Sequence, residues 1–383
     1  MQEQRIPIYQ VIQDYIKQEI SRGGWKTGDQ IPTEKELMAK FGVSRITVSN
    51  ALTGLAKEGW LHRIQGKGSY VSGTALNEGT RGIQEGRQAE EEERLRLIGL
   101  ITPSLSDYFM LRLQSGIAKA LRPSNCHLVV MLSEGSKKRE AEAIRELLRM
   151  GAEGLIIFPL DSKTHNDEIL RLKLEKFPFL IIDRYLTGIE THFIGSDGVE
   201  AARLAVNHLH ALGHRDIAIC SGMPLSTTTI EQRVSGYLLA MKELGEKINP
   251  ALMLTDFSLK VDGGHAVLDG EAGEDDPLRR CVEAGLATAY IALNGPVALH
   301  LYRIVKQLGL RVPQDLSIVA FDNLSPSREF DFFTYIDQHE EEVGRLAGKH
   351  ILELMNESGE QPYRKIMLVP DIVARESTAP PSA

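Results

Sequence analysis

A chain of 383 residues, 42% hydrophobic and 25% charged, is long enough for two or three globular domains. No apolar run approaches the roughly 18 residues of a membrane span, and MQEQRIPIYQ lacks the pattern of a signal peptide. We therefore expect a cytoplasmic protein with no membrane partner. The net charge of −8 is uneven, because residues 1–74 hold ten Lys and Arg against seven Asp and Glu, a net +3, which leaves −11 elsewhere. This asymmetry indicates a basic module joined to an acidic one.

Cysteine and histidine spacing gives no sign of a metal or a cofactor. Cys126, Cys220 and Cys281 stand far apart with no C-x-x-C pair, which argues against zinc and against a disulfide framework. The segment 208–214, HLHALGH, holds three histidines whose spacing does not place them together on one helix face. No Ser-His-Asp or Cys-His arrangement is local enough to indicate catalysis. We predict no metal, no cofactor and no enzymatic activity.

Two helical patterns open the chain. The first has an apolar stripe that ends at a glycine pair, and its members are Val11, Ile12, Tyr15, Ile16 and Ile20. Thr33 and Glu36 have the spacing of a capping box at the start of a second helix, EKELMAKF, which Gly42 ends. With a further helix directly after Gly42, this order predicts a helix-turn-helix.

The segment 41–52, FGVSRITVSNAL, predicts that third helix, with Ser44 as its cap. Val48, Leu52 and Leu55 recur at helical spacing and face inward. The opposite face carries short hydroxyls and one arginine, which suit a DNA major groove because small side chains let the backbone approach and arginine reaches guanine. The outward candidates are Arg45, Ile46, Thr47, Ser49 and Asn50. The sequence leaves open whether Ile46 contacts a thymine methyl or lies partly buried.

Next, EGWLHRIQGKGSYVS predicts two strands joined by a tight Q-G-K-G turn. A β-hairpin directly after a helix-turn-helix is typical of a wing. Its tip carries Gln65 and Lys67, which we expect to enter a minor groove or to meet phosphates.

Residues 5–72 closely resemble the winged-helix DNA-binding domain of the GntR family of bacterial transcription regulators, since P-T-E-K-E-L, F-G-V-S-R-x-T-V and Q-G-K-G-S-Y-V occur in the family's order. The resemblance implies that the operator contacts come from Lys35, Ser44, Arg45, Thr47, Ser49, Gly66 and Lys67. Family members often have a polar residue at the Ile46 position and arginine at the Ser49 position, so the base preference does not carry over.

After the DNA-binding domain of residues 1–74, residues 75–94 are polar and glycine-rich, which predicts a linker. In residues 95–378, short apolar runs alternate with amphipathic segments, as in parallel sheets covered by helices on both faces. About ten strands would be many for one sheet. We therefore expect two α/β lobes.

The runs IGLITPSLSDYF, LGHRDIAICSG and LGLRVPQDLSIVAFDN, among others, resemble the two-lobed sugar-binding domain of the LacI family and periplasmic binding proteins over roughly 95–376. A GntR-type DNA-binding domain followed by such a domain resembles the arabinose-repressor type of regulator. The resemblance implies a winged helix-turn-helix (α+β) joined to a two-lobed α/β periplasmic-binding-protein-like domain with parallel sheets.

In such domains the ligand lies at the carboxyl ends of the strands, where carboxylates, amides and guanidinium groups bind sugar hydroxyls and an aromatic ring covers the C–H surface. The candidates at strand ends are Asp107, Tyr108, Phe109, Asp183, Arg184, Arg233, Asn294 and Asp322. The resemblance places Arg233, Asn294 and Asp322 at positions that usually contact the effector. Where most relatives have Asn-Asp, this chain has Asn294-Gly295, which removes a carboxylate from the expected contacts.

The sequence thus predicts a homodimeric repressor of carbohydrate-utilisation genes, which binds double-stranded operator DNA and leaves it when a sugar binds between the lobes. Dimerisation is expected through the large domain. An activator, or a sensor of purines or another small molecule, remains an alternative because fold does not fix the ligand. A sugar-processing enzyme is the least favoured alternative.

Overall fold

The computed structural model describes residues 8–64, 68–72, 96–105, 108–160, 165–223, 227–255, 257, 259, 261–262, 265–266, 273–324, 331–356 and 362–382. Contacts divide the chain into two compact units, Met1–Arg94 and Leu95–Ala383. The segment expected as a linker, 75–94, lies outside the described residues, as do Gln65, Gly66, Lys67 and Asp107. Each unit is described by itself.

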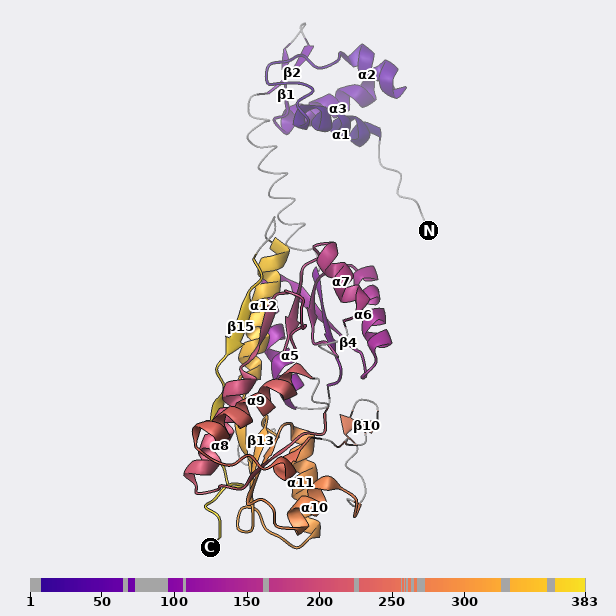
Figure 1. The fold of residues 1–383 in the computed structure, drawn as a ribbon. Coiled ribbons are helices and arrows are strands. Elements are labelled where there is room, and N and C mark those ends of the chain that lie inside the picture. The colour runs from indigo at the N-terminus through magenta and orange to yellow at the C-terminus, as the bar shows by residue number, and fades with distance from the viewer. Residues whose placement is uncertain are drawn as a thin grey trace. The chain divides into compact units, whose positions relative to one another are not determined.

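The N-terminal unit contains α1 (Ile8–Ser21), α2 (Glu34–Phe41), α3 (Arg45–Lys57), β1 (Leu61–Ile64) and β2 (Gly68–Val71) (Figure 1). Val48, Leu52 and Leu55 are buried, which confirms the predicted inward face of α3. In α1, Ile12, Ile16 and Ile20 are buried, while the prediction that Val11 shares their stripe is wrong, since Val11 is exposed. Position 11 lies too far around the helix from that stripe to reach the core.

The predicted hairpin is also present, because β1 and β2 pair as antiparallel strands with Leu61 opposite Val71. The loop before α2 extends this hairpin. The Val71 amide donates to the Asp29 carbonyl over 2.9 Å, and the Ile31 amide donates to the Ser69 carbonyl over 3.1 Å. The base of the wing is thereby fixed to the helical core.

The first lobe of the C-terminal unit has a sheet with strand order β15-β7-β6-β5-β3-β4, all parallel. Its strands are β3 (Arg96–Thr102), β4 (Cys126–Leu132), β5 (Ala152–Ile157), β6 (Phe179–Ile182), β7 (Phe193–Ser196) and β15 (Lys365–Leu368). One face is covered by α5 (Tyr108–Leu121), which leads into a 3₁₀ turn (Arg122–Ser124), and by α12 (Glu340–Asn356). The other is covered by α6 (Lys137–Arg149) and α7 (Asp167–Leu174), as Figure 1 shows.

The second lobe has the order β16-β14-β13-β12-β8-β9, in which β16 alone among these strands is antiparallel to its neighbour. Its strands are β8 (Ile217–Cys220), β9 (Met253–Leu254), β12 (Ala289–Ala292), β13 (Ser317–Phe321), β14 (Thr334–Asp337) and β16 (Asp371–Val373). The helices α8 (Gly198–Ala211) and α9 (Thr228–Glu243) cover one face, and α10 (Pro277–Glu283) and α11 (Gly295–Gln307) cover the other. A 3₁₀ turn (Pro250–Leu252) precedes β9, and a short hairpin, β10 (Val261–Asp262) and β11 (His265–Ala266), follows it.

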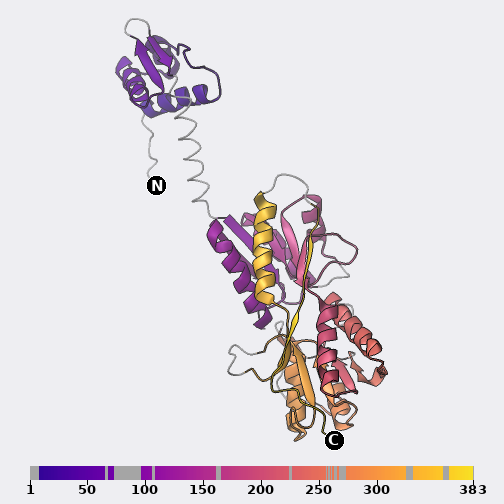
Figure 2. The ribbon, with the colours of Figure 1, turned by 90° about the vertical axis from the view of Figure 1, so that its left-hand side faces the viewer.

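Within the described residues the chain crosses between the lobes three times, after β7, after β14 and between β15 and β16. In Figure 2 the yellow segment runs from one lobe to the other along the third crossover. The two lobes with parallel sheets therefore confirm the predicted fold class. Loop residues that join two domains absorb the backbone rotations of hinge closure, so we assign the hinge between the lobes to these crossovers.

Two glycines bring α5 and α12 into close contact. A Cβ at Gly116 would lie 2.0 Å from the Glu341 carbonyl oxygen, and one at Gly344 would lie 2.0 Å from the Leu113 carbonyl oxygen. Only glycine fits at both positions. The start of α12, directly after the second crossover, is therefore fixed against α5.

The C-terminal residues are part of the second lobe. Ser377 is fully buried, and its hydroxyl donates to the Ile318 carbonyl over 2.6 Å. The Ala379 amide donates to Ser317 Oγ over 3.1 Å. The chain thus stays bound to this lobe beyond residue 378.

Candidate functional sites

The turn between α2 and α3 is fixed by caps at three helix ends. At the start of α2, Thr33 and Glu36 form the predicted capping box, in which the Thr33 amide donates to Glu36 Oε2 over 2.7 Å. These hydrogen bonds lower the pKa of Glu36. Gly42 ends α2 in the left-handed conformation at φ 63°, and Ser44 caps α3. The angle between α2 and α3 is therefore set by local chemistry.

The outer face of α3 presents the predicted residues in two groups. Arg45, Ile46 and Asn50 are exposed, and Ile46 is 74% accessible, which resolves the alternative left open by the sequence in favour of a free apolar side chain. Thr47 and Ser49 are half-buried. Lys35, on α2, is exposed. A single exposed apolar side chain is common on protein surfaces, so the exposure of Ile46 shows only that its side chain is accessible to a partner.

The side chains at the start of α3 are held in place. Arg45 Nε lies 3.0 Å from Glu34 Oε2, although 79% of the Arg45 side chain is accessible. The Ser44 hydroxyl accepts from the Thr47 amide over 3.4 Å and lies 3.0 Å from the Thr47 hydroxyl. The Ser44 hydroxyl therefore acts as the N-cap of α3. Glu34, which the sequence did not single out, joins the starts of α2 and α3.

In the second lobe, Arg233 of α9 is buried and reaches the carboxyl ends of the central strands. Its Nη1 donates to the Leu293 carbonyl and its Nη2 donates to Gln338 Oε1 over 2.9 Å. Gln338 in turn donates from Nε2 to Asp322 Oδ1. The Arg233 guanidinium lies 4.4 Å from the centre of the Phe321 ring. Residues at the ends of three strands, β12, β13 and β14, thus converge on one cation.

This cation is balanced by carboxylates from both lobes. Burial lowers the pKa of Arg233, while the charges of Asp322 and of Asp183, in the first lobe, oppose that shift. Asp183 directly follows β6 and Asp322 directly follows β13, and both have positive φ, 62° and 76°. Non-glycine residues in this conformation cost of order 1–3 kcal/mol and cluster at functional sites. The structure therefore brings Asp183, Arg233 and Asp322 together, as the sequence predicted separately for each strand end.

Arg184, directly after Asp183 at the end of β6, is the buried arginine of the first lobe, as Arg233 is of the second. It is 9% accessible, its Nη1 donates to the Leu160 carbonyl over 2.9 Å, and its guanidinium lies 4.9 Å from the centre of the Phe158 ring. Its Nη2 also lies 3.9 Å from Met223 Sδ, in the second lobe. Arg184 therefore links the loop after β5 to the loop after β8.

A buried carboxylate, Glu140, fixes the loop that binds Arg184. Glu140 of α6 is 3% accessible and accepts from the Leu160 amide and from Asn166 Nδ2, each over 2.8 Å. Burial is the largest effect on Glu140 and raises its pKa, while these hydrogen bonds and the charge of Arg184 lower it. Glu140 thus fixes the residue whose carbonyl binds Arg184.

The remaining candidates have more structural roles. Phe109 is 8% accessible and packs edge-on against Phe158, with ring centres 6.3 Å apart, so it belongs to the core beneath Arg184. Tyr108, at the start of α5, is half-buried. Asn294 is half-buried and caps α11, since its Oδ1 accepts from the Val297 amide over 3.0 Å. Gln338 and Met223 are site residues that the sequence did not single out, because neither adjoins a recognisable motif.

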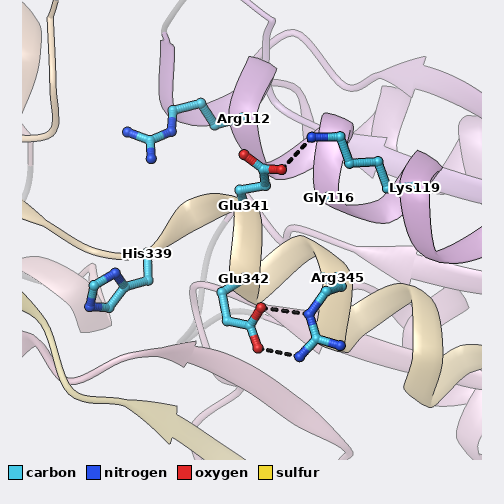
Figure 3. Close-up of a pocket in the computed structure, with 7 residues that line it drawn as sticks. All are labelled: Arg112, Gly116, Lys119, His339, Glu341, Glu342 and Arg345. Atoms are coloured by element: carbon cyan, nitrogen blue, oxygen red, sulfur yellow. Dashed lines mark hydrogen bonds and ion pairs between the residues drawn. The ribbon is translucent and has the colours of Figure 1, made fainter. Parts of the chain in front are cut away.

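A charged hollow of about 250 Å³ lies beside the second crossover (Figure 3). It is lined by Arg112, Gly116, Lys119, His339, Glu341, Glu342 and Arg345. Its cations are paired within it or at its wall: Arg345 Nε lies 2.6 Å from Glu342 Oε2, and Arg112 Nε lies 3.4 Å from Glu340 Oε2. His339 Nε2 lies 3.2 Å from Asp371 Oδ2, on the third crossover. The pair of His339 and Asp371 joins the second crossover to the start of β16. Lys119 pairs with Glu341, so each of the hollow's three cations has a carboxylate partner.

No group of three or more His, Cys, Asp or Glu side chains that could hold a metal ion occurs among the described residues. Two histidines of segment 208–214 have other partners. His214 Nδ1 lies 2.8 Å from Thr288 Oγ1, and His208 Nε2 lies 3.0 Å from Thr378 Oγ1. Among the helices that the structure describes, none is long and apolar enough to cross a membrane.

Known proteins share both parts of this architecture. Residues 8–71 match the bacterial regulatory proteins of the gntR family, and residues 206–378 match the periplasmic binding protein-like domain. The chain is 28% identical to the arabinose metabolism transcriptional repressor of Geobacillus stearothermophilus over 384 residues, which cover 99% of each chain. It is 27% identical to the protein of the same name from Halalkalibacterium halodurans over 386 residues, which cover 97% of this chain and 96% of that one.

A solved LacI-family transcriptional regulatory protein from Corynebacterium glutamicum superposes with a TM-score of 0.59 and 26% identity, covering 75% of this chain and all of that one. A winged helix-turn-helix joined to such a two-lobed domain defines a transcription regulator that responds to a small ligand. The chain is a transcription regulator with a GntR-type DNA-binding domain at residues 8–71 and a LacI-type, periplasmic-binding-protein-like effector domain, and the two arabinose repressors align with nearly all of it. The matched families and relatives are regulators, which confirms the prediction that the chain is not an enzyme.

Proposed function

We propose that this regulator is a repressor of carbohydrate-utilisation genes that leaves its operator when a sugar binds between the lobes. The observation that carries this proposal is the buried Arg233, held by Leu293 and Gln338 and balanced by Asp183 and Asp322 from opposite lobes. A ligand that contacts groups of both lobes binds the closed arrangement best and shifts the population toward it.

The polar groups at this site suit a neutral polyol. Carboxylates accept hydrogen bonds from sugar hydroxyls and guanidinium groups donate to them, often in bidentate pairs. Among the described residues, Asp183, Asp322 and Glu140 offset the cations Arg184 and Arg233, so an anionic ligand would meet no excess of positive charge. The names of the two arabinose repressors support a sugar as the effector of this chain as well.

On the DNA side, we assign base contacts to Arg45 and Ile46, and phosphate or base-edge contacts to Thr47, Ser49 and Asn50. Lys35 and the wing residues Gln65, Gly66 and Lys67 are assigned to the DNA backbone or the minor groove. The exposure of Arg45 and Ile46 at the first turn of α3 supports this assignment. The positive end of the same helix favours a nearby phosphate.

We further propose that two copies bind a pseudo-palindromic operator, because one winged helix reads too few base pairs for a specific site. Dimerisation is assigned to the effector domain. The edge strand β4 supports this, since its residues Leu128–Leu132 are apolar and, among the strands that the structure describes, it pairs only with β3. Leu111 on α5 is 50% exposed. Unpaired apolar edges are usually covered in the native assembly.

The test is a thermal-shift screen of the full chain with pentoses, hexoses, deoxysugars, sugar acids and purines. A ligand at 100 times its Kd adds about 2.7 kcal/mol of stability, so a true effector is readily detected. The stabilising ligand is then added to the protein bound to an operator selected from random duplexes. Release by a sugar supports the proposal. Stabilisation by purines alone would contradict the sugar, and tighter DNA binding with ligand would contradict release.

A further inference from the structure

Glu140 of α6 is a buried carboxylate that joins three segments of the first lobe. Its Oε1 accepts from the Leu160 amide and its Oε2 accepts from Asn166 Nδ2, each over 2.8 Å. Leu160 lies in the segment after β5, and Asn166 caps α7, since its Oδ1 accepts from the Glu168 amide over 3.1 Å. One carboxylate therefore holds the segment after β5 and the start of α7 against α6.

The two donors require a carboxylate at residue 140. Asn166 Nδ2 also donates to the Lys137 carbonyl over 3.1 Å, which fixes the orientation of the Asn166 amide. A carboxylate accepts hydrogen bonds with both oxygens, whereas the amide of glutamine accepts with one atom and presents a donor on the other. In Glu140→Gln, either the Leu160 amide or Asn166 Nδ2 would therefore face another donor. Asn166 is 4% accessible, so water does not readily replace the lost acceptor.

The position of Leu160 matters because its carbonyl binds the Arg184 guanidinium. Arg184 Nη1 donates to that carbonyl over 2.9 Å, and the guanidinium lies 4.9 Å from the centre of the Phe158 ring. Both contacts come from the segment after β5, which Glu140 holds. The Glu140 carboxylate thus acts on Arg184 through one intervening residue, and the opposite charges of the two groups attract each other.

From this position Arg184 reaches the second lobe. Its Nη2 lies 3.9 Å from Met223 Sδ. Met223 is fixed in turn, because its amide donates to Ser221 Oγ over 3.1 Å and Ser221 is fully buried. Asp183, directly before Arg184, acts by its charge on Arg233 of the second lobe. The Arg184 guanidinium therefore lies where the two lobes meet.

We propose that Glu140 is a positioning residue for the effector response: its carboxylate fixes the Leu160 carbonyl and thereby places the Arg184 guanidinium where it contacts both the effector and the second lobe. This assignment rests on the proposed function, in which Arg184 binds the effector. A side chain that is already held in its bound orientation loses less conformational freedom on binding, so a released Arg184 should bind the effector more weakly.

The first experiment tests the positioning without a ligand, by methyl NMR of the full chain labelled at its methionine methyl groups. The chain has ten methionines, so the Met223 signal can be assigned by its loss in Met223→Leu. We expect Glu140→Gln to move the Met223 signal toward its position in Arg184→Gln. The matched control, Glu142→Gln on the same helix, should leave the signal in place, because the Glu142 side chain is 50% accessible.

Two provisions separate positioning from a loss of fold. The signals of Met110 and Met241, which are buried in the cores of the first and second lobes, show whether each lobe is intact. If Glu140→Gln does not fold, Glu140→Asp takes its place, since it keeps the carboxylate but withdraws it from Leu160 by one methylene group. The same movement of the Met223 signal is expected.

The second experiment measures calorimetric affinities for four neutral sugars, L-arabinose, D-ribose, D-xylose and D-galactose, each titrated separately. For a sugar that binds the unaltered chain, Glu140→Gln should lower the affinity about tenfold, as expected when a charged group leaves its hydrogen-bonded position. In the Arg184→Gln background the same change should cost less than about twofold, because no guanidinium is left to position. Glu142→Gln should bind like the unaltered chain.

An unmoved Met223 signal or an unchanged sugar affinity in a folded Glu140→Gln chain would overturn the role of Glu140. A tenfold loss that persists in the Arg184→Gln background would overturn it too, since Glu140 would then act through another group. If none of the four sugars binds the unaltered chain, the result counts against the proposed function, and the Met223 signal still decides whether Glu140 positions Arg184.

Discussion

Nη2 of Arg233 donates to Oε1 of Gln338 over 2.9 Å, although 105 residues separate the two in sequence. The same Gln338 amide donates to Asp322, so one side chain joins the buried cation to the carboxylate at the end of β13. Arg233 comes from α9 and Gln338 follows β14, directly before the second crossover. A ligand that engages Arg233 or Asp322 therefore acts on a residue at the start of the hinge.

Replacing Gln338 with leucine should impair effector binding without impairing DNA binding. The change removes the hydrogen bonds that Gln338 makes to the buried guanidinium Nη2 and to the Asp322 carboxylate, and a buried polar group that loses its partner costs about 1–3 kcal/mol. We expect a lower thermal midpoint of the effector domain and at least a tenfold loss of effector affinity, measured by calorimetry. Gln307→Leu, at the exposed end of α11, is the control. Unchanged effector affinity would show that the network is only structural.

Arg45→Ala should weaken operator binding by roughly 1–3 kcal/mol and relax the preference at one base position, because a guanidinium that reads guanine carries sequence information. Binding is measured by fluorescence anisotropy on the operator and on a random duplex. Lys57→Ala, at the exposed opposite end of the same helix, is the matched control. Equal losses on both duplexes would assign Arg45 to phosphates instead.

Glu34→Ala tests whether Glu34 positions the Arg45 side chain or only contributes a negative charge near the DNA-facing surface. Glu34 Oε2 holds Arg45 Nε at 3.0 Å, so its removal should lower the ratio of operator to random affinity. The loss of a negative charge near the DNA-facing surface should at the same time strengthen binding to random duplex. We expect opposite changes in the two affinities at fixed salt. A parallel rise in both would mean that Glu34 only adds charge.

The helix-turn-helix could be predicted from the sequence because its signals are local. The Thr33 and Glu36 capping box, the Ser44 cap and the spacing of Val48 and Leu52 each involve residues within one or two turns. Many strands of both lobes could also be predicted, because they are continuous apolar runs. Short elements escaped prediction, notably β15, β16, α7 and α10, because three to eight residues give too few periods to recognise.

The composition of the site could be predicted only in part. Ligands of parallel sheets usually bind at the carboxyl ends of the strands. Asp183 and Asp322 could be predicted as site residues from this rule, because each directly follows an apolar run. The links between them required the topology. Glu34 meets Arg45 across a turn, Arg233 meets Gln338 across 105 residues, and Leu324 fills the space beside Gly295. No periodicity in the sequence encodes such contacts. The sequence therefore predicted which types of residue the site contains, but it did not predict which residues contact one another.

A buried histidine pair in the first lobe should make stability depend on pH. His192 is 7% accessible, its Nδ1 accepts from the Arg364 amide over 3.3 Å, and it lies 3.0 Å from His350 Nε2. Burial lowers the pKa of His192 to about 4, and the charges of His350 and Arg364 act in the same direction. The folded chain therefore holds this histidine neutral where the unfolded chain, with a pKa of about 6.5, takes up a proton.

Since the unfolded state binds more protons between these two values, the free energy of unfolding should fall as the pH drops from about 6.5 to about 4, by at most about 1.4 kcal/mol per pH unit for this group. Urea unfolding of the full chain at pH 7, 5.5 and 4.5, followed through the effector-domain transition, measures the fall. In His192→Asn it should become shallower, while His127→Asn, at an exposed position of β4, should follow the unaltered chain. Identical slopes for all three proteins would assign the acid sensitivity to other groups.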